Sequence, residues 1–136
     1  MASPAKYLLD ASALYPLILR LKEGLLLYKD HFAVLDLTIY EAGSALLKAH
    51  KKGAVKHLSP VAKMFEEVVK GLRKLSIEAE VFEVLGIAAK SGLTFYDASY
   101  AYVARREGLK LVTEDPELLR FPEAITVEAL LRELRP

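Results

Sequence analysis

The stretch KLVTEDPEL, Lys110 to Leu118, runs from an apolar, strand-like segment directly into acidic residues and a proline. One interpretation is purely structural: Asp115 is a helix N-cap and Pro116 is the first helical residue. The other is that a carboxylate is held at the end of a sheet strand for chemistry. The positions of the other strands and acids in the chain bear on this choice.

Strand-like and helix-like patterns alternate along the whole chain. KYLLDAS reads as a strand that ends at Asp10, FAVLDLT as a strand over Phe32 to Thr38, and Leu109 to Thr113 as a later one. This alternation predicts the α/β class, with a mostly parallel central sheet flanked by helices on both faces. The further elements expected are helices at about Leu14 to Leu27 with Pro16 in the first turn, Ile39 to Lys52, Ser59 to Leu75, within 75–92 after a short strand, 94–108 and 128–134, and a last short strand at Ile125 to Val127.

Length and composition favour one globular domain over residues 1–136. Hydrophobic residues make up 53% of the 136 and charged residues 27%, a profile that is not that of a disordered chain. The apolar runs are shorter than the roughly 20 residues that a membrane span needs, and MASPAKYLLD lacks the apolar core of a signal peptide. We therefore expect a cytoplasmic protein with no membrane partner.

The residue types that are missing limit the chemistry. The chain has no cysteine, which excludes disulfides, thiolate nucleophiles and zinc-thiolate sites. It also has no asparagine or glutamine beside many charged residues, which favours a heat-adapted source. The net charge is +1, so any anionic partner has to be bound locally and not by a strongly basic surface.

Four acids follow the predicted strands or open the predicted helices. Asp10 and Asp115 each end an apolar strand, and parallel strands bring their carboxyl ends to one edge of a sheet. Glu41 and Asp97 lie three residues after a threonine, the spacing of a capping box. Taken singly, each acid is explained by helix capping. Taken together, they predict a cluster of carboxylates at one edge of the sheet.

A cluster of carboxylates is unstable without a cation, because like charges force some of the group to take up protons. Oxygen ligands without cysteine favour Mg²⁺ or Mn²⁺ over zinc. A metal held by carboxylates and water keeps open positions for phosphate oxygens and an activated water. The pattern therefore indicates metal-assisted hydrolysis of a phosphate ester.

The segments LLDAS, IYEAGSALLK, LTFYDASYAYVARREG and LVTEDPEL resemble, in order and spacing, the acidic signatures of the PIN-domain ribonucleases. The resemblance covers nearly the whole chain and is strongest to the single-domain VapC-type toxins of prokaryotic toxin–antitoxin pairs. It implies a single PIN-like domain and an Mg²⁺- or Mn²⁺-dependent endoribonuclease. It also implies an RNA substrate, a homodimer and an antitoxin protein as partner.

The resemblance also implies which residues form the site. Asp10, Glu41, Asp97 and Asp115 match the acidic quartet that is both catalytic and metal-binding, and Ser12 and Thr113 match small hydroxyl residues that support it. Glu114 offers a second carboxylate beside Asp115, but the Thr-x-Asp spacing favours Asp115. Asp36 is interpreted as a strand-end acid near solvent and is left out of the site.

Other features are open to two interpretations. The basic stretch Lys48 to His57 could contact a phosphate backbone, although a solvated helix end explains it as well. Tyr96, Tyr100 and Tyr102 could stack on bases, although their helical setting favours packing or an interface for most of them. Alternatives to the toxin are a PIN nuclease of RNA maturation without an antitoxin, a receiver-like signalling module, and a binding module that keeps the fold without activity.

Overall fold

Five short parallel strands form the sheet at the centre of the computed structural model, which describes residues 5–134. The spatial order is β3-β2-β1-β4-β5, so that β1 lies in the middle. Pairing is in register, with Leu9 opposite Val34 on one side and opposite Val112 on the other. The strands are β1 (Tyr7–Leu9), β2 (Phe32–Leu35), β3 (Arg73–Leu75), β4 (Lys110–Val112) and β5 (Ala124–Ile125).

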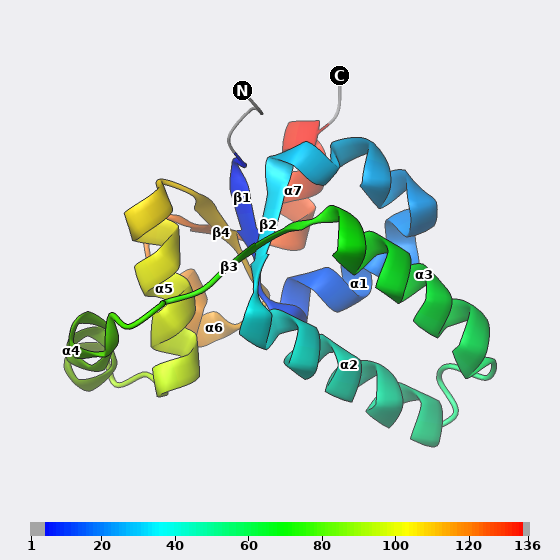
Figure 1. Ribbon diagram of the computed structural model, residues 1–136, viewed down its shortest axis with the longest axis horizontal. Coiled ribbons are helices and arrows are strands. Elements are labelled where there is room, and N and C mark those ends of the chain that lie inside the picture. The colour runs from blue at the N-terminus through cyan, green and yellow to red at the C-terminus, as the bar shows by residue number, and fades with distance from the viewer. Residues whose placement is uncertain (1–4, 135–136) are drawn as a thin grey trace.

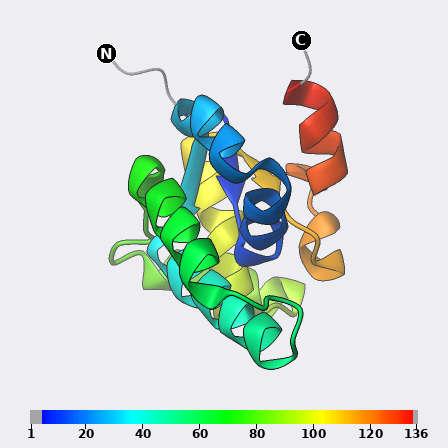
Figure 2. The same ribbon diagram turned by 90° about the vertical axis from the view of Figure 1, so that its right-hand side faces the viewer.

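Helices cover both faces of this sheet, as the alternating pattern predicted (Figure 1). Figure 2 shows one group of helices in front of the sheet and the yellow helix α5 behind it. The first group consists of α1 (Ala11–Leu21), the 3₁₀ segment η1 (Lys22–His31), α2 (Asp36–Lys51), α3 (Leu58–Gly71) and α7 (Val127–Leu134). The second consists of α5 (Phe95–Glu107) and α6 (Pro116–Leu119), and α4 (Val81–Ser91) packs on α5.

Side-chain alternation along the strands divides the core into two layers. Leu9 and Val34 point into the layer with α1, α3 and α7, whereas Leu8 and Leu35 point into the layer with α5 and α6. All four of these side chains are buried. Burial on both faces explains why the strands read as continuous apolar runs instead of alternating ones.

Two predicted boundaries were wrong. The second strand ends at Leu35 instead of Thr38, because Asp36 already begins α2. The third helix ends at Gly71 instead of Leu75, and Arg73–Leu75 forms the edge strand β3. Gly71 lies so close to η1 that an added Cβ would come within 3.3 Å of Leu26 Cδ2, which a larger residue could not tolerate without a shift.

The first helix also differs from its prediction. It begins at Ala11, because Asp10 caps it, and therefore Pro16 lies in its second turn. Proline there leaves one intrahelical hydrogen bond unmade. The helix ends at Leu21, and η1 continues in the tighter 3₁₀ form. In the described part of the chain, no helix is long and apolar enough to cross a membrane.

Candidate active site

The segments that carry the four predicted acids meet at the carboxyl edge of the sheet, which lies at the bottom of Figure 1. There the chain leaves β1 for α1, β2 for α2 and β4 for α6, and α5 also begins at this edge. The connections from β1 and β4 diverge here, since β1 leads to β2 on one side while β4 lies on its other side. Such a point in a parallel sheet forms a crevice in which ligands bind.

Asp10 is the most buried of these acids, with 4% of its surface exposed. Ser12 Oγ donates to its Oδ1 at 2.7 Å, the backbone N–H of Ala13 donates to the same oxygen at 3.0 Å, and Thr113 Oγ1 donates to its Oδ2. Since Ser12 and Thr113 each give their single proton to Asp10, the 3.3 Å contact between the two hydroxyls carries no proton. Asp10 is thus held by three donors in one orientation.

The surroundings of Asp10 still favour its protonated form. Burial raises the pKa of this carboxyl to about 6, although its three donors act in the opposite direction. The negative charge of Asp115 raises this pKa further. A buried carboxylate with a second carboxylate nearby lacks positive charge, which a cation would provide.

Asp115 and Glu114, the two neighbouring acids of KLVTEDPEL, make different contacts. Asp115 Oδ1 accepts from the N–H of Glu117 at 2.9 Å and so caps α6, while the same carboxylate acts electrostatically on Asp10. The capping interpretation therefore holds for Asp115, and its charge also acts on a second predicted site acid. Glu114 points elsewhere: its Oε1 accepts from the N–H of Val127 at 2.8 Å, at the start of α7.

Asp97 lies in the first turn of α5, where Thr94 caps the helix by accepting from the N–H of Asp97 at 3.1 Å. Partial burial raises the pKa of the Asp97 carboxyl, and the charges of Asp115 and Glu41 raise it further. The effect of both charges on Asp97 indicates that these acids share one electrostatic environment, although they come from three separate segments of the chain.

A chain of hydrogen bonds that the sequence did not predict ends at the Glu41 carboxylate. The N–H of Leu35 donates to Thr38 Oγ1 at 3.0 Å, Thr38 is 2.9 Å from the Tyr100 hydroxyl, and this hydroxyl donates to Glu41 Oε1 at 2.8 Å. Because Tyr100 gives its proton to Glu41, Thr38 must be the donor to Tyr100. Thr38 therefore sits inside α2 as a buried link, and its predicted role as the cap three residues before Glu41 was wrong.

Burial raises the pKa of the Tyr100 hydroxyl far above its usual range, and the nearby charge of Glu41 adds to this effect. Tyr100 is therefore a permanent donor to Glu41. It was predicted to serve packing or an interface, and its 2% exposure agrees with packing. In the sequence, the only sign of its hydrogen bond to Glu41 is its position three residues after Asp97, on the same face of α5.

The acids do not form a ready-made metal site. Among residues 5–134, no three acidic or histidine side chains are close enough together to hold a metal ion. The donor set still fits a hard divalent cation: it consists of oxygens, and none of the salt bridges within the described residues uses one of these four acids. Mg²⁺ keeps several waters and is bound through one or two carboxylates, so convergence of all four is not required.

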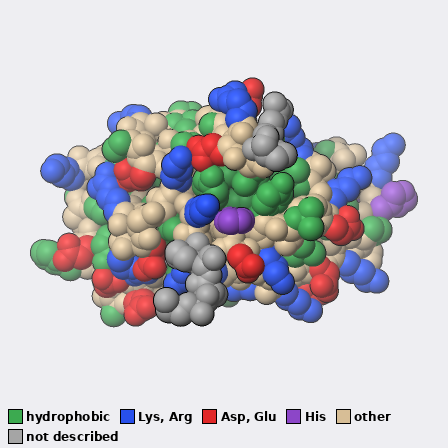
Figure 3. Space-filling view, turned by 90° about the horizontal axis from the view of Figure 1, so that it is seen from above, with side chains coloured by type: hydrophobic (Ala, Val, Ile, Leu, Met, Phe, Trp, Pro, Cys, Tyr) green, Lys and Arg blue, Asp and Glu red, His purple; other side chains and the backbone are tan. Residues whose placement is uncertain are grey.

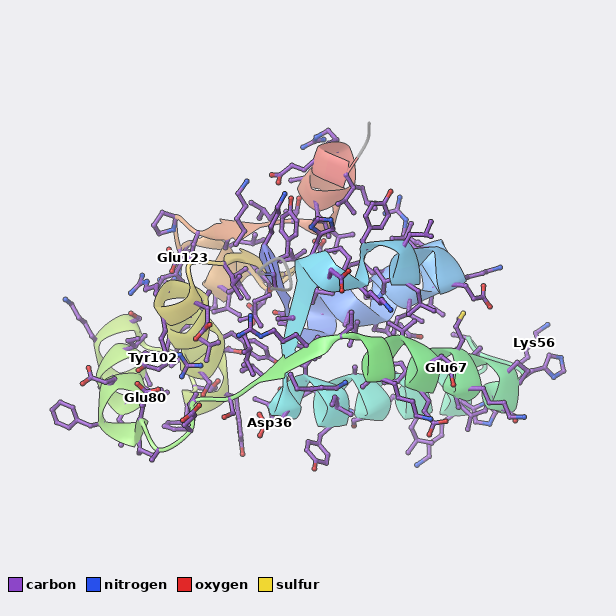
Figure 4. The ribbon with its side chains drawn as sticks, turned by 45° about the horizontal axis from the view of Figure 1, so that its top comes forward. Asp36, Lys56, Glu67, Glu80, Tyr102 and Glu123 are labelled. Atoms are coloured by element: carbon purple, nitrogen blue, oxygen red, sulfur yellow. The ribbon has the colours of Figure 1, made fainter. Side chains whose placement is uncertain are left out.

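Charge elsewhere on the surface is mixed. Figure 3 views the opposite edge, where the strands begin, and there basic and acidic side chains of the described residues are interspersed around an apolar area. The basic stretch Lys48 to His57 starts near the end of α2, about 10 Å along the helix from Glu41. Asp36 is the exposed first residue of α2, on the side of that helix nearest α5 (Figure 4).

The fold and this edge together define an α/β protein with carboxylates gathered at the switch point of a parallel sheet. The chain belongs to the PIN-domain family, whose sequence model matches residues 7–124. The fold class predicted from the sequence is thereby confirmed, as is the resemblance to PIN-domain proteins of the VapC type. Receiver domains of the CheY type have the strand order 2-1-3-4-5, which this sheet does not share.

Individual relatives are similar over most or all of their length. The chain is 45% identical to exonuclease VapC9 of Pyrobaculum aerophilum, an alignment that covers 96% of this chain and 97% of that protein. It is 34% identical to ribonuclease VapC3 of the same organism, over 68% of this chain and 72% of that protein. The crystal structure of PAE2754 from Pyrobaculum aerophilum superimposes with a TM-score of 0.85 at 44% identity, covering 97% of this chain and 98% of the other.

Proposed function

We propose that the protein is an Mg²⁺- or Mn²⁺-dependent endoribonuclease that hydrolyses phosphodiester bonds of RNA as the toxin of a VapBC-type pair. The observation that carries the proposal is the setting of Asp10, a buried carboxylate held by three donors beside the charge of Asp115. The similarity to proteins named exonuclease VapC9 and ribonuclease VapC3 supports nuclease activity.

The metal would be held by Asp10 and Asp115, with Asp97 and Glu41 acting directly or through water. When bound, it would supply positive charge to the phosphate oxygens and lower the pKa of a bound water, so that this water would lose its proton more easily. The need for such a charge is supported by the raised pKa values of Asp10 and Asp97 and by the absence of a basic partner for either among residues 5–134.

The remaining residues hold the acids in place. Ser12 and Thr113 fix both oxygens of Asp10, and Tyr100 fixes Glu41. Asp97 is only partly buried, so it is accessible to water, and its raised pKa favours acceptance of a proton. We assign to Asp97 the orientation of the attacking water and acceptance of its proton.

The same proposal includes two protein partners. A homodimer and an antitoxin are expected for a VapC-type toxin, and a small protein encoded directly upstream of this one would support the toxin over a nuclease of RNA maturation. Co-expression with that protein is expected to give a soluble complex that does not cleave RNA. Cleavage that continues undiminished in the complex would contradict the toxin assignment.

The first experiment compares linear and circular forms of the same RNAs with Mg²⁺, with Mn²⁺ and with a chelator. Cutting of circular RNA is expected, since an endonuclease needs no free end. Products that shorten only linear RNA from one end would show an exonuclease, the activity in the name of the relative that is 45% identical.

The variants for this experiment are Asp97→Asn and Glu114→Gln. Asp97→Asn should abolish metal-dependent cleavage. Glu114→Gln is the matched control, because Glu114 neighbours the site but its side chain binds the start of α7, and glutamine can still accept that hydrogen bond. Full activity of Asp97→Asn under matched metal would contradict the proposal.

A further inference from the structure

A pocket of about 280 Å³ lies at the carboxyl edge beside the acids. It lies between the end of β2, the start of α2, the loop after β3 and the start of α5. Figure 4 shows Asp36 at this place, at the end of α2 that is nearest to α4 and α5. Residues that line it include Asp36, Leu37, Ile77, Glu78, Phe95 and Tyr96.

The first turns of α2 and α5 contribute to the pocket, and the same two helices carry Glu41 and Asp97. Asp36 and Leu37 lie one turn before Glu41 on α2, and Tyr96 is the residue before Asp97 on α5. Adjacent Cα atoms are about 3.8 Å apart. An RNA strand with a phosphodiester at the acids would therefore have a neighbouring nucleotide within reach of the pocket.

The walls of the pocket are suited to a flat aromatic group. Leu37, Ile77 and Phe95 are partly buried and apolar, and Tyr96 is 59% exposed. Tyr40, which is 76% exposed, follows Asp36 by one helical turn and so lies on the same side of α2. Exposed aromatic side chains beside a nuclease site provide surfaces on which bases stack. A volume at the low end of ligand pockets fits one ring system.

The polar groups of the pocket are acceptors. Asp36 and Glu78 contribute carboxylates, and no lysine or arginine side chain of the described residues lines the pocket. One oxygen of Asp36 accepts from the N–H of Leu37, and its other oxygen can accept a hydrogen bond from a ligand. Carboxylates repel phosphate but accept hydrogen bonds from the N–H groups of a base. Guanine offers two neighbouring N–H donors, whereas uracil has one, flanked by two carbonyl oxygens.

We propose that this pocket binds one base of the RNA next to the cleaved phosphodiester, stacks it on Tyr96, and prefers guanine over uracil. The inference rests on the proposed nuclease function for its biological meaning, but binding of the base does not require the metal or the phosphate. The stacking comes from Tyr96, and the preference comes from Asp36 and Glu78.

The test measures binding of guanosine and uridine, which carry no phosphate, to the full chain in the presence of chelator. Backbone amide shifts followed by NMR report the site of binding. We expect guanosine to shift the amides of Leu37, Ile77 and Tyr96 and to bind more tightly than uridine. Tyr96→Ala should weaken guanosine binding about tenfold. Asp36→Asn should reduce the ratio of guanosine to uridine affinity, because its amide can donate to a uracil carbonyl.

Phe82→Ala is the matched control, since Phe82 is an aromatic residue that is 85% exposed on α4 and does not line the pocket. It should leave guanosine binding unchanged. Binding that is equal for both nucleosides, shifts that lie outside the pocket, or equal losses in Tyr96→Ala and Phe82→Ala would overturn the inference. RNA cleavage with no guanosine binding would overturn the pocket inference and leave the nuclease proposal intact. Guanosine binding in the pocket with no RNA cleavage would support the pocket inference and contradict the nuclease proposal.

Discussion

The hydroxyl of Tyr100 donates to Glu41 Oε1 at 2.8 Å and is itself 2.9 Å from Thr38 Oγ1. Tyr100 and Glu41 come from different helices, α5 and α2, and lie 59 positions apart in the sequence. Tyr100 thus links the helix that carries Asp97 to the helix that carries Glu41. Because its hydroxyl keeps its proton, it remains a hydrogen-bond donor to Glu41.

Tyr100→Phe is expected to lower kcat about tenfold or more, the usual cost of removing a partner that orients a metal-site carboxylate. KM for RNA should change little, because Tyr100 is buried and does not reach the surface. Steady-state cleavage and a metal titration measure both effects. Tyr102→Phe is the control, since it removes a hydroxyl from the same helix whose partner is Glu80 and not an acid of the site. Equal effects of the two substitutions would contradict a positioning role.

The stability of the metal-free protein should fall as pH rises from about 4 to about 6. The folded pKa of Asp10 is about 6, above the value of 3.8 for an unperturbed carboxyl, so the folded state binds more protons than the unfolded state in this range. The expected loss is about 2–3 kcal/mol, and it is complete above the folded pKa. Urea unfolding with chelator at several pH values measures it.

Asp10→Asn serves as the reference in this pH series, because contributions of groups that do not interact with Asp10 are shared by the two proteins. The difference in unfolding free energy between them should depend on pH only between about 4 and 6. A difference that is constant with pH would show that Asp10 has an ordinary pKa. Added Mg²⁺ should stabilise the parent more at pH 7 than at pH 5, since the metal binds the deprotonated carboxylate.

The two neighbouring acids of KLVTEDPEL should respond in opposite ways. Asp115→Asn is expected to abolish metal-dependent cleavage with little loss of stability, because the amide oxygen can still cap α6. Glu114→Ala should cost about 1 kcal/mol, because the N–H of Val127 loses its acceptor, and should leave cleavage intact. Chemical unfolding and RNA cleavage of both variants separate the two roles. Loss of activity in Glu114→Ala alone would reverse the assignment.

The sequence predicted the sheet and, to within one residue, the ends of β1 and β4, because apolar runs buried on both faces are easy to recognise. It did not predict where FAVLDLT stops, since the helix signal of Asp36 lies inside a strand-like run. It also placed the next short strand after Leu75, whereas β3 is Arg73–Leu75, because Arg73 and Lys74 are exposed at the sheet edge and lack an apolar pattern. Local sequence cannot show that β2 offers a free edge for such a segment.

The acids at 10 and 115 were predictable because each follows a strand and caps a helix. The links between segments were not: Tyr100 to Glu41 and Thr113 to Asp10 join residues 59 and 103 positions apart. The pairing of β1 with β4 brings Thr113 beside Asp10, and sequence patterns do not state which strands pair. The burial of Asp10 follows from the same pairing, and with it the shift of its pKa.

Thr113 provides the last prediction, because its hydroxyl both donates to Asp10 and accepts from the N–H of Asp115 at 3.0 Å. Thr113→Val keeps the shape but removes both hydrogen bonds, so it should cost about 1–3 kcal/mol and raise the pKa of Asp10 above about 6. Metal-dependent cleavage at pH 6 should then fall more than at pH 8. Thr113→Ser keeps the hydroxyl and loses only a buried methyl group, so its pH profile should match that of the parent. If Val and Ser at this position give the same pH profile, the hydroxyl has no part in setting the charge of Asp10.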